Sequence, residues 1–281
     1  MRERDSMSEK PLPERIQDAV EHVRGESDLV PRVGLILGTG LGDVSGALRG
    51  AVKLPYDSIP GFVSSTTESH AGELMLGKVK DTPVVAMNGR VHFYEGYSME
   101  QVGFPVRVMR ALGAEVLIAS NAVGGMNAQF RAGDIMAVTD HINLMGDNPL
   151  IGPNYETLGP RFPDMSEPYD ARLLEIVEEI ALEERIPLRR GVFVAVAGPN
   201  LETRAEYRML RAVGGDVVGM SLIPETIVAV HGGMRVLALS VITDECFPDA
   251  LERVEIQRIL AVAAAAEPSL KKLVTRVLER I

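Results

Sequence analysis

The chain has 281 residues, a formal net charge of −10 and a single cysteine, Cys246. A length of this order fits one large domain or two small ones. The negative charge argues against nucleic acid or an anionic membrane as a partner, because both repel an acidic protein. One cysteine cannot form an intrachain disulfide, which favours a reducing, cytoplasmic location. The polar N-terminus has no apolar core of a secretory signal.

In chain order, the apolar pattern predicts short strands that alternate with amphipathic helices. Residues 1–13 are expected to form a flexible tail, followed by a helix over Arg15–Val23. Buried strands are predicted over 33–37, 84–87, 116–120, 135–144, 192–197, 217–221 and 236–243. Helices are predicted over 99–114, 170–185, 203–214 and 255–281. The segment 73–87 is typical of a β-hairpin.

This alternation predicts an α/β fold with a largely parallel sheet, made mixed by the hairpin. No repeat and no low-complexity linker divides the chain, so we expect one domain over 14–281. The segment 145–165 is rich in Gly, Pro and Asn and has no periodicity. Loops of this length in compact domains usually carry function or make contacts, although a surface excursion without a role is an alternative.

A glycine-rich turn, GLILGTGLGD, ends the first predicted strand at 34–43. Glycines let backbone N–H groups turn toward an anion, and Thr39 adds a hydroxyl donor. A Walker A loop would need a lysine near its end, and none is present. A dinucleotide fingerprint would need a third glycine, where Asp43 stands. Alone, this segment is equally compatible with a tight turn that binds nothing.

Polar residues follow several other predicted strands where packing does not require them. They lie in the sequences SHAG, NGRVHFYEGY, SNAVGGMN, GPNLET, GMS and TD. An arginine, histidines, hydroxyls and turned backbone amides together suit a phosphate dianion. A carboxylate such as Glu202 can accept N–H groups of a heterocycle. Each residue alone has a structural explanation, such as Glu202 in the first turn of a helix, but the joint pattern is harder to explain in this way.

These motifs resemble those of the trimeric purine nucleoside phosphorylases. The resemblance runs from about Val33 to Thr243 through LGTGLG, SHAGEL, NGRVHFYEGY, ASNAVGGMN, GDIMAVTDHINL, AGPNLETRAEYRML and VGMSLIPETIVA, in the family's order. It implies a single α/β domain with a mixed, partly barrel-like central sheet flanked by helices. It also implies a homotrimer with active sites near the subunit interfaces.

Carried across residue by residue, the resemblance implies three groups of site residues. The phosphate ligands would be Thr39, His70, Arg90, His92, the backbone of Ala122, and Ser221. The purine would contact Leu201, Glu202 and Asp244. The ribose would contact Tyr94, Met220, Ile256 and, supplied by the neighbouring subunit, Phe162. The central catalytic positions would be His92, Glu202 and Asp244.

The implied reaction is a pentosyl transfer of purine salvage. A purine nucleoside, preferably inosine or guanosine or their deoxy forms, and inorganic phosphate give the free base and (deoxy)ribose 1-phosphate. Because phosphate itself attacks, the resemblance implies no protein nucleophile, no metal and no organic cofactor. The phosphate dianion would stabilise an oxocarbenium-like transition state, and groups near the base would help it to leave.

Two positions depart from the family's pattern. Asp244 stands where the family usually has asparagine, and Ile256 stands near the place of a histidine that faces the ribose 5′-hydroxyl. An aspartate at the base and an apolar 5′ pocket resemble the methylthioadenosine phosphorylases, the alternative enzyme. Against this alternative, Glu202 suits a base that carries an N1–H. A non-catalytic purine or phosphate sensor and, more distantly, a nucleotide-binding dehydrogenase are the remaining alternatives.

Overall fold

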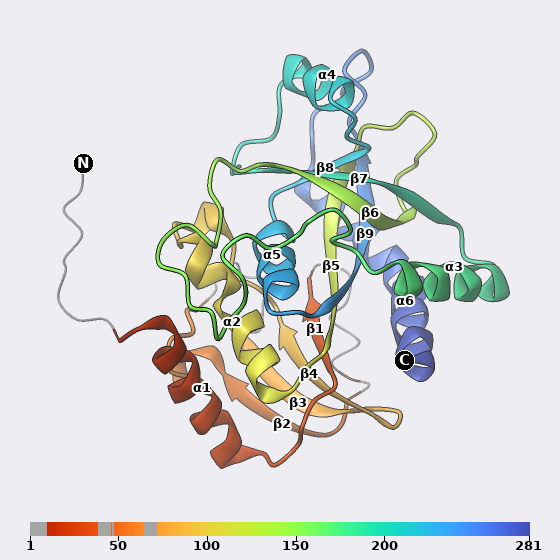
Figure 1. The fold of residues 1–281 in the computed structure, drawn as a ribbon. Helices are drawn as coiled ribbons and strands as arrows, with labels where there is room; N and C mark the ends of the chain where they lie inside the picture. Colours follow the sequence, from red (N-terminus) through yellow and green to blue (C-terminus); the bar gives the residue numbers. More distant parts are fainter. Residues whose placement is uncertain (1–9, 39–45, 47, 65–71) are drawn as a thin grey trace.

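In the computed structural model, which describes residues 10–38, 46, 48–64 and 72–281, nine strands form one continuous sheet (Figure 1). Their order is β2–β3–β4–β1–β5–β8–β7–β6–β9, and β5 also pairs with β9. This extra pairing closes β5, β8, β7, β6 and β9 into a ring, while the other strands extend from it as an open sheet. The predicted α/β fold with a mixed, partly barrel-like sheet is confirmed.

The strands run close to the predicted ranges. They are β1 Val33–Leu37, β2 Arg49–Pro55, β3 Glu73–Val79, β4 Thr82–Asn88, β5 Val116–Gly125, β6 Ile135–Leu144, β7 Leu188–Val196, β8 Val217–Gly219 and β9 Arg235–Glu245. The predicted hairpin is the antiparallel pair β3–β4. The edge strand β2 was not predicted, because most of its residues are exposed or half-buried and it lacks a continuous apolar run.

The helices cover the two sides of the sheet. They are α1 Leu12–Glu26, α2 Met99–Leu112, α3 Ala171–Glu184, α4 Arg204–Ala212, α5 Ile223–His231 and α6 Ile256–Arg280. In Figure 1, α1, α2 and α5 lie to one side and α3 and α6 to the other, with α4 near the top of the barrel. The predicted tail over 1–13 lies largely outside the described residues, and α1 already begins at Leu12.

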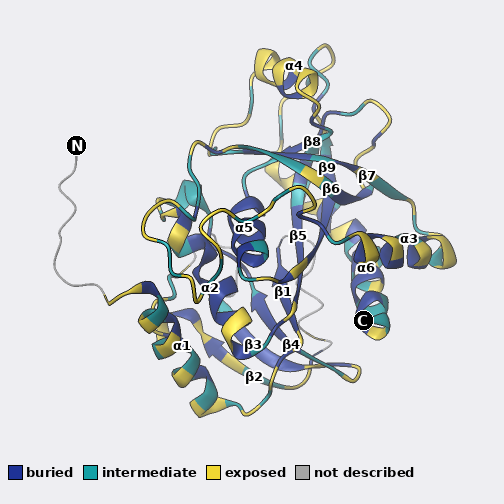
Figure 2. Cartoon of the chain, in the orientation of Figure 1, coloured by how far each residue is buried: buried dark blue, intermediate teal, exposed yellow. Residues whose placement is uncertain are grey.

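Helix α5 was missed by the sequence analysis. Nearly all of its residues are buried, and Figure 2 shows it in the interior between α2 and the sheet. A helix that is covered all round has no polar face, so its sequence lacks the periodicity that reveals a helix. The segment 145–165 contains no helix or strand, as its composition predicts. No helix within the described ranges is long and apolar enough to cross a membrane.

Four parallel strands determine where side chains converge. β1 pairs in parallel with β4 and β5, and β5 pairs in parallel with β9. Their carboxyl ends therefore open at the same edge of the sheet, which is where ligands bind in open α/β sheets. The polar motifs that follow these strands in the sequence are brought together at this edge.

Asp170 ties the start of α3 to the start of β9. Its carboxylate accepts a hydrogen bond from the backbone N–H of Leu173 at 2.8 Å, as an N-cap. It also accepts from Arg235 Nε at 2.7 Å and from Arg235 Nη2 at 2.8 Å. The hydrogen bonds from Arg235 hold the pKa of Asp170 below its usual range. This carboxylate therefore contributes to stability while it is ionised.

We expect Asp170→Ala to lower the free energy of unfolding by about 1–2 kcal/mol at pH 7, because the cap and a partly exposed ion pair are lost. The pKa of Asp170 is lower in the folded chain than in the unfolded chain. Its contribution is therefore present above the unfolded pKa and is lost as pH falls through the folded pKa. In urea unfolding, the difference between wild type and variant should shrink as the pH falls below about 4, the ordinary pKa of an aspartate.

Asp170→Asn is the matched control, because asparagine keeps a capping oxygen and loses only the charge. It should cost less stability than Asp170→Ala at pH 7. Equal stability of Asp170→Ala and the wild type at pH 7 would contradict the assigned role.

Candidate active site

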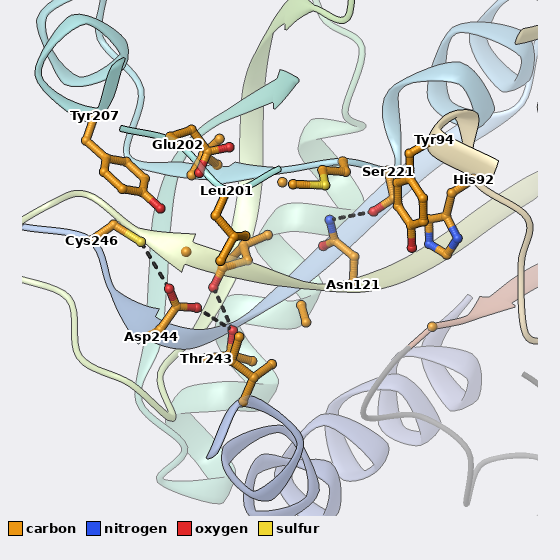
Figure 3. Close-up of a pocket in the computed structure, with 18 of the residues that line it drawn as sticks. His92, Tyr94, Asn121, Leu201, Glu202, Tyr207, Ser221, Thr243, Asp244 and Cys246 are labelled. Carbon is orange, nitrogen blue, oxygen red and sulfur yellow. Dashed lines mark hydrogen bonds between the residues drawn. The ribbon is translucent and has the colours of Figure 1, made fainter. Parts of the chain in front are cut away.

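A cavity of about 280 Å³ lies at the carboxyl edge of the parallel strands and gathers most of the predicted site residues (Figure 3). The predicted residues that line it are Arg90, His92, Tyr94, Ala122, Leu201, Glu202, Met220, Ser221 and Asp244. Asn121, Tyr207, Cys246 and Ile259 also line it and were not predicted as site residues. The cavity therefore unites residues as far apart in the chain as Gly38 and Ile259.

Of the other four predicted residues, two lie outside the part of the chain that the structure describes and two do not line the cavity. Thr39 and His70 lie outside the described residues. Phe162 is 88 % exposed in the segment 145–165 and does not line the cavity of its own chain. Ile256 is 61 % exposed at the start of α6, and Ile259, one turn further along the helix, lines the cavity in its place.

Arg90 is buried just beyond the end of β4. Its Nη2 donates to the Ser120 carbonyl oxygen at 2.5 Å, and its Nη1 lies 3.4 Å from Glu225 Oε1. A Cβ at Gly38 would lie 2.4 Å from that same carbonyl oxygen and 3.3 Å from Arg90 Nη2. Only glycine fits this close approach of β1 to β5. Burial lowers the pKa of Arg90, although a guanidinium remains charged at neutral pH.

His92 and Tyr94 follow Arg90 on a tight 3₁₀ turn, Phe93–Glu95. The Glu95 carboxylate accepts from the His92 backbone N–H at 2.7 Å and lies 2.9 Å from His92 Nδ1. Because a carboxylate only accepts, Nδ1 carries the proton and Glu95 fixes the orientation of the ring. The ring stacks on Tyr94, with centroids 4.7 Å apart, as Figure 3 shows.

Ser221 is held by a chain of buried polar side chains. Ser240 Oγ donates to Asn121 Oδ1 at 2.7 Å, and Asn121 Nδ2 donates to Ser221 Oγ at 3.2 Å. Because Ser221 Oγ accepts this bond, its own O–H can donate to a ligand in the cavity. Asn121 belongs to the glycine-rich sequence SNAVGGMN but was not predicted as a site residue. A polar amide inside an otherwise apolar strand is the feature of the sequence that could have indicated its role.

Asp244 enters the cavity through a β-bulge in β9. Val123 of β5 pairs with Ile242, whereas the next residue, Gly124, pairs with Asp244. The extra residue, Thr243, breaks the alternation of side chains, so that consecutive residues of β9 line the cavity. A Cβ at Gly124 would lie 2.6 Å from Cys246 Sγ, which explains the glycine.

Both oxygens of the Asp244 carboxylate have donors. Thr243 Oγ1 donates to Oδ1 at 2.8 Å, and Cys246 Sγ donates to Oδ2 at 3.1 Å (Figure 3). Burial and the charge of Asp244 raise the pKa of the Cys246 thiol, so the thiol remains a donor. These two contacts orient the carboxylate within the cavity.

Glu202 stands between β7 and α4, one residue before Thr203, the N-cap of α4. It therefore does not lie in the first turn of the helix, which was the explanation for Glu202 that needed no binding role. Burial raises the pKa of Glu202, with smaller contributions from the charges of Glu206 and Asp244, while a hydrogen bond with Tyr207 lowers it. The Tyr207 hydroxyl also interacts with Cys246, so it connects the two carboxylates.

The cavity thus has two chemically different ends, as Figure 3 shows. Ser221, Asn121, His92 and Tyr94 lie at one end, which Arg90 makes cationic and rich in donors. Glu202, Tyr207, Cys246 and Asp244 lie at the acidic other end. Among the residues that the structure describes, no three His, Cys, Asp or Glu side chains are grouped so that they could hold a metal ion.

Comparison with known proteins agrees with this arrangement. Residues 32–279 match the model of the phosphorylase superfamily. The chain is 54 % identical over 233 residues to purine nucleoside phosphorylase 1 of Bacillus subtilis (strain 168), covering 83 % of this chain and 86 % of the relative. The chain belongs to the purine nucleoside phosphorylase family. It is an enzyme of the pentosyltransferase class, which confirms the resemblance in the motifs.

Solved structures of the family share the fold. Isoform 2 of purine nucleoside phosphorylase from Schistosoma mansoni, in complex with cytosine and ribose-1-phosphate, has a TM-score of 0.92 at 37 % identity, covering 95 % of this chain and 96 % of that chain. A schistosoma purine nucleoside phosphorylase in complex with hypoxanthine has a TM-score of 0.90 at 36 % identity, with coverages of 95 % and 97 %.

Proposed function

We propose that the chain catalyses phosphorolysis of purine nucleosides, with the cationic end of the cavity holding phosphate and the acidic end holding the base. The observation that carries this proposal is the placement of Arg90, His92 and Ser221 in one cavity with Glu202 and Asp244. The ribose-1-phosphate and hypoxanthine bound to the related schistosoma enzymes support this choice of ligands.

At the phosphate end, side chains and backbone groups attract the phosphate and fix its orientation. The buried guanidinium of Arg90 attracts the dianion, and a low local dielectric strengthens this attraction. The Ser221 hydroxyl, His92 and the backbone at Ala122 add polar contacts, and we propose that Thr39 and His70 complete the set. A phosphate held in this way is oriented to attack C1′ and stabilises the positive charge that develops on the ribose.

At the base end, two carboxylates compete over the choice of purine. An ionised Glu202 accepts the N1–H of a 6-oxopurine, whereas N1 of adenine is itself an acceptor. An ionised Asp244 accepts a 6-amino group or a protonated N7. We propose that Glu202 dominates, so that inosine and guanosine are preferred, and that Asp244 shares a proton with N7 or reaches O6 through water. Leu201 would cover the base, and Tyr94 and Met220 would line the ribose.

Phosphorolysis of 5′-methylthioadenosine is the second candidate. It is favoured by Asp244 at the acidic end and by the apolar Ile259 in the lining of the cavity. For either substrate, phosphate is the co-substrate and we propose no further cofactor. The buried free thiol of Cys246 supports the proposed cytoplasmic location.

The test of the proposed function is base release from inosine, guanosine, adenosine and 5′-methylthioadenosine, with and without phosphate. Release should require phosphate and be fastest with a 6-oxopurine nucleoside.

Arg90→Ala should lower kcat/KM for phosphate by at least about ten- to a hundredfold, because losing a charged hydrogen bond costs about 1.5–3 kcal/mol. Arg189→Ala, which removes an arginine outside the cavity, is the control and should change it little. Unchanged phosphate kinetics in Arg90→Ala would remove Arg90 from the site.

We expect Asp244→Asn to widen the inosine-over-adenosine ratio of kcat/KM by about ten- to a hundredfold, because an amide can donate to O6 and no longer favours a 6-amino group. The Thr243 hydroxyl can rotate to accept from the new amide, so the side chain should keep its orientation. Steady-state kinetics with both nucleosides measure the ratio.

Glu245→Gln, one residue further along β9, removes the same charge outside this cavity and is the matched control. It should leave the ratio unchanged. A ratio that is equal in Asp244→Asn and the wild type would show that Asp244 does not face the base. An outright preference of the wild type for adenosine or methylthioadenosine would establish the second candidate function.

We propose a homotrimer in which the exposed Phe162 of one subunit completes the cavity of its neighbour. Phe162→Ala and Glu202→Ala should each be poorly active alone. When the two variants are co-expressed, a site that takes Glu202 from one chain and Phe162 from the other is intact, so activity should exceed the sum of the separate variants. Light scattering should give the mass of three chains, and no gain on co-expression would argue that Phe162 does not act between subunits.

A further inference from the structure

Glu225 is a buried carboxylate behind the cavity that the catalytic scheme above does not use. It lies in the first turn of α5 and is 2 % exposed, like Arg90. Its Oε1 is 3.4 Å from Arg90 Nη1. Burial raises the pKa of this carboxylate, while Arg90 and the backbone N–H groups of Glu225 itself and of Leu222 lower it. Glu225 does not line the cavity, so it would contact the phosphate ligands and not the phosphate.

The backbone next to Ser221 is strained. Leu222 has φ 75° and ψ −45°, and the N–H of Ile223 donates to the Ser221 carbonyl oxygen at 2.9 Å. These values describe a γ-turn of the rare positive-φ type, which is unfavourable for a leucine. Such a conformation persists only where its surroundings enforce it. The attraction between the Leu222 N–H and the Glu225 carboxylate is one of the interactions that do so.

We propose that Glu225 is a positioning residue that holds both Arg90 and the Ser221–Leu222 turn in place for the phosphate dianion. The proposal rests on the phosphate site proposed above. A single buried carboxylate thereby connects two phosphate ligands that are far apart in the sequence, one after β4 and one after β8.

Neutralising Glu225 should change phosphate affinity in opposite directions, depending on whether Glu225 positions its neighbours or acts only through its charge. A negative charge beside Arg90 weakens the attraction of Arg90 for another anion. If Glu225 acted only through its charge, its neutralisation would tighten phosphate binding. If it positions Arg90 and the turn, neutralisation should weaken phosphate binding and slow turnover. Among the described residues, Arg90 and Tyr169 are the titratable groups that interact with Glu225, and Arg90 is the cation of the two. Burial raises the pKa of the Tyr169 phenol.

The test is Glu225→Gln, which keeps the size of the side chain but removes its charge and leaves one acceptor oxygen for Arg90 and the two backbone N–H groups. We expect the KM for phosphate to rise by about tenfold or more and kcat to fall, while the KM for inosine changes less than about threefold. Calorimetric titration with inorganic phosphate should show the same weakening. Unchanged phosphate kinetics, or a lower KM for phosphate, would overturn the proposal.

Asp170→Asn is the matched control, because Asp170 also pairs with an arginine at a helix start but lies away from the cavity. It should shift the unfolding temperature without changing the KM for phosphate. If Glu225→Gln does not fold, Glu225→Asp, which keeps the charge on a shorter side chain, should show the same selective rise in the KM for phosphate.

Arg90→Lys and the double variant with Glu225→Gln complete the experiment. Positioning predicts that the two substitutions are not additive, with a coupling of about fivefold or more in kcat/KM for phosphate. If Arg90→Lys itself leaves phosphate kinetics unchanged, the phosphate site is wrong. If Arg90→Lys weakens phosphate and Glu225→Gln does not, only the positioning role is overturned.

Discussion

The pairing of β5 with β9 is the contact on which the rest of this structure depends. It closes the barrel and, because it is parallel like the β1–β4 and β1–β5 pairings, it brings the carboxyl end of β9 to the same edge as those of β1, β4 and β5. Its bulge brings Asp244 into the cavity, and its regular part lets Ser240 of β9 reach Asn121 of β5. Both ends of the cavity therefore depend on this strand pair, and a change in its register would displace Asn121 at one end and Asp244 at the other.

The charges of the cavity suit the ligands proposed for its two ends: the cationic end attracts the phosphate dianion, and the carboxylates of the acidic end accept N–H groups of the base. Positive charge develops on the ribose while negative charge moves into the base, so the proton that Asp244 is proposed to share with N7 offsets the repulsion between the carboxylates and the leaving base. A guanidinium that is held by a carboxylate and a carbonyl oxygen can recruit the attacking dianion without reorganising. The acidic groups at the other end are fixed by hydroxyl and thiol donors. The fold thus fixes these charges before any ligand binds, which is the basis of electrostatic preorganisation.

The two carboxylates at the base end occupy different environments. Asp244 has a donor for each oxygen, whereas burial raises the pKa of Glu202, and hydrogen bonds from its own backbone N–H and from Tyr207 offset this only in part. Two acids with such different surroundings can take different protonation roles against one purine. Tyr207 and Cys246 lie between the two carboxylates. The choice between bases therefore depends on all four side chains together.

The sequence by itself determined most strands and most helices, since their apolar periods are local properties, but it did not show the edge strand β2. It also pointed to many of the residues around the cavity, because glycine-rich turns and polar groups at strand ends stand out against buried runs. It did not reveal α5, whose covered faces leave no pattern, and it placed Ile256 where the pitch of α6 presents Ile259. Only the tertiary structure paired Arg90 with Glu225 and Asn121 with Ser221. Those contacts join residues more than 90 positions apart, and the strand order, which no local pattern encodes, decides which of them meet.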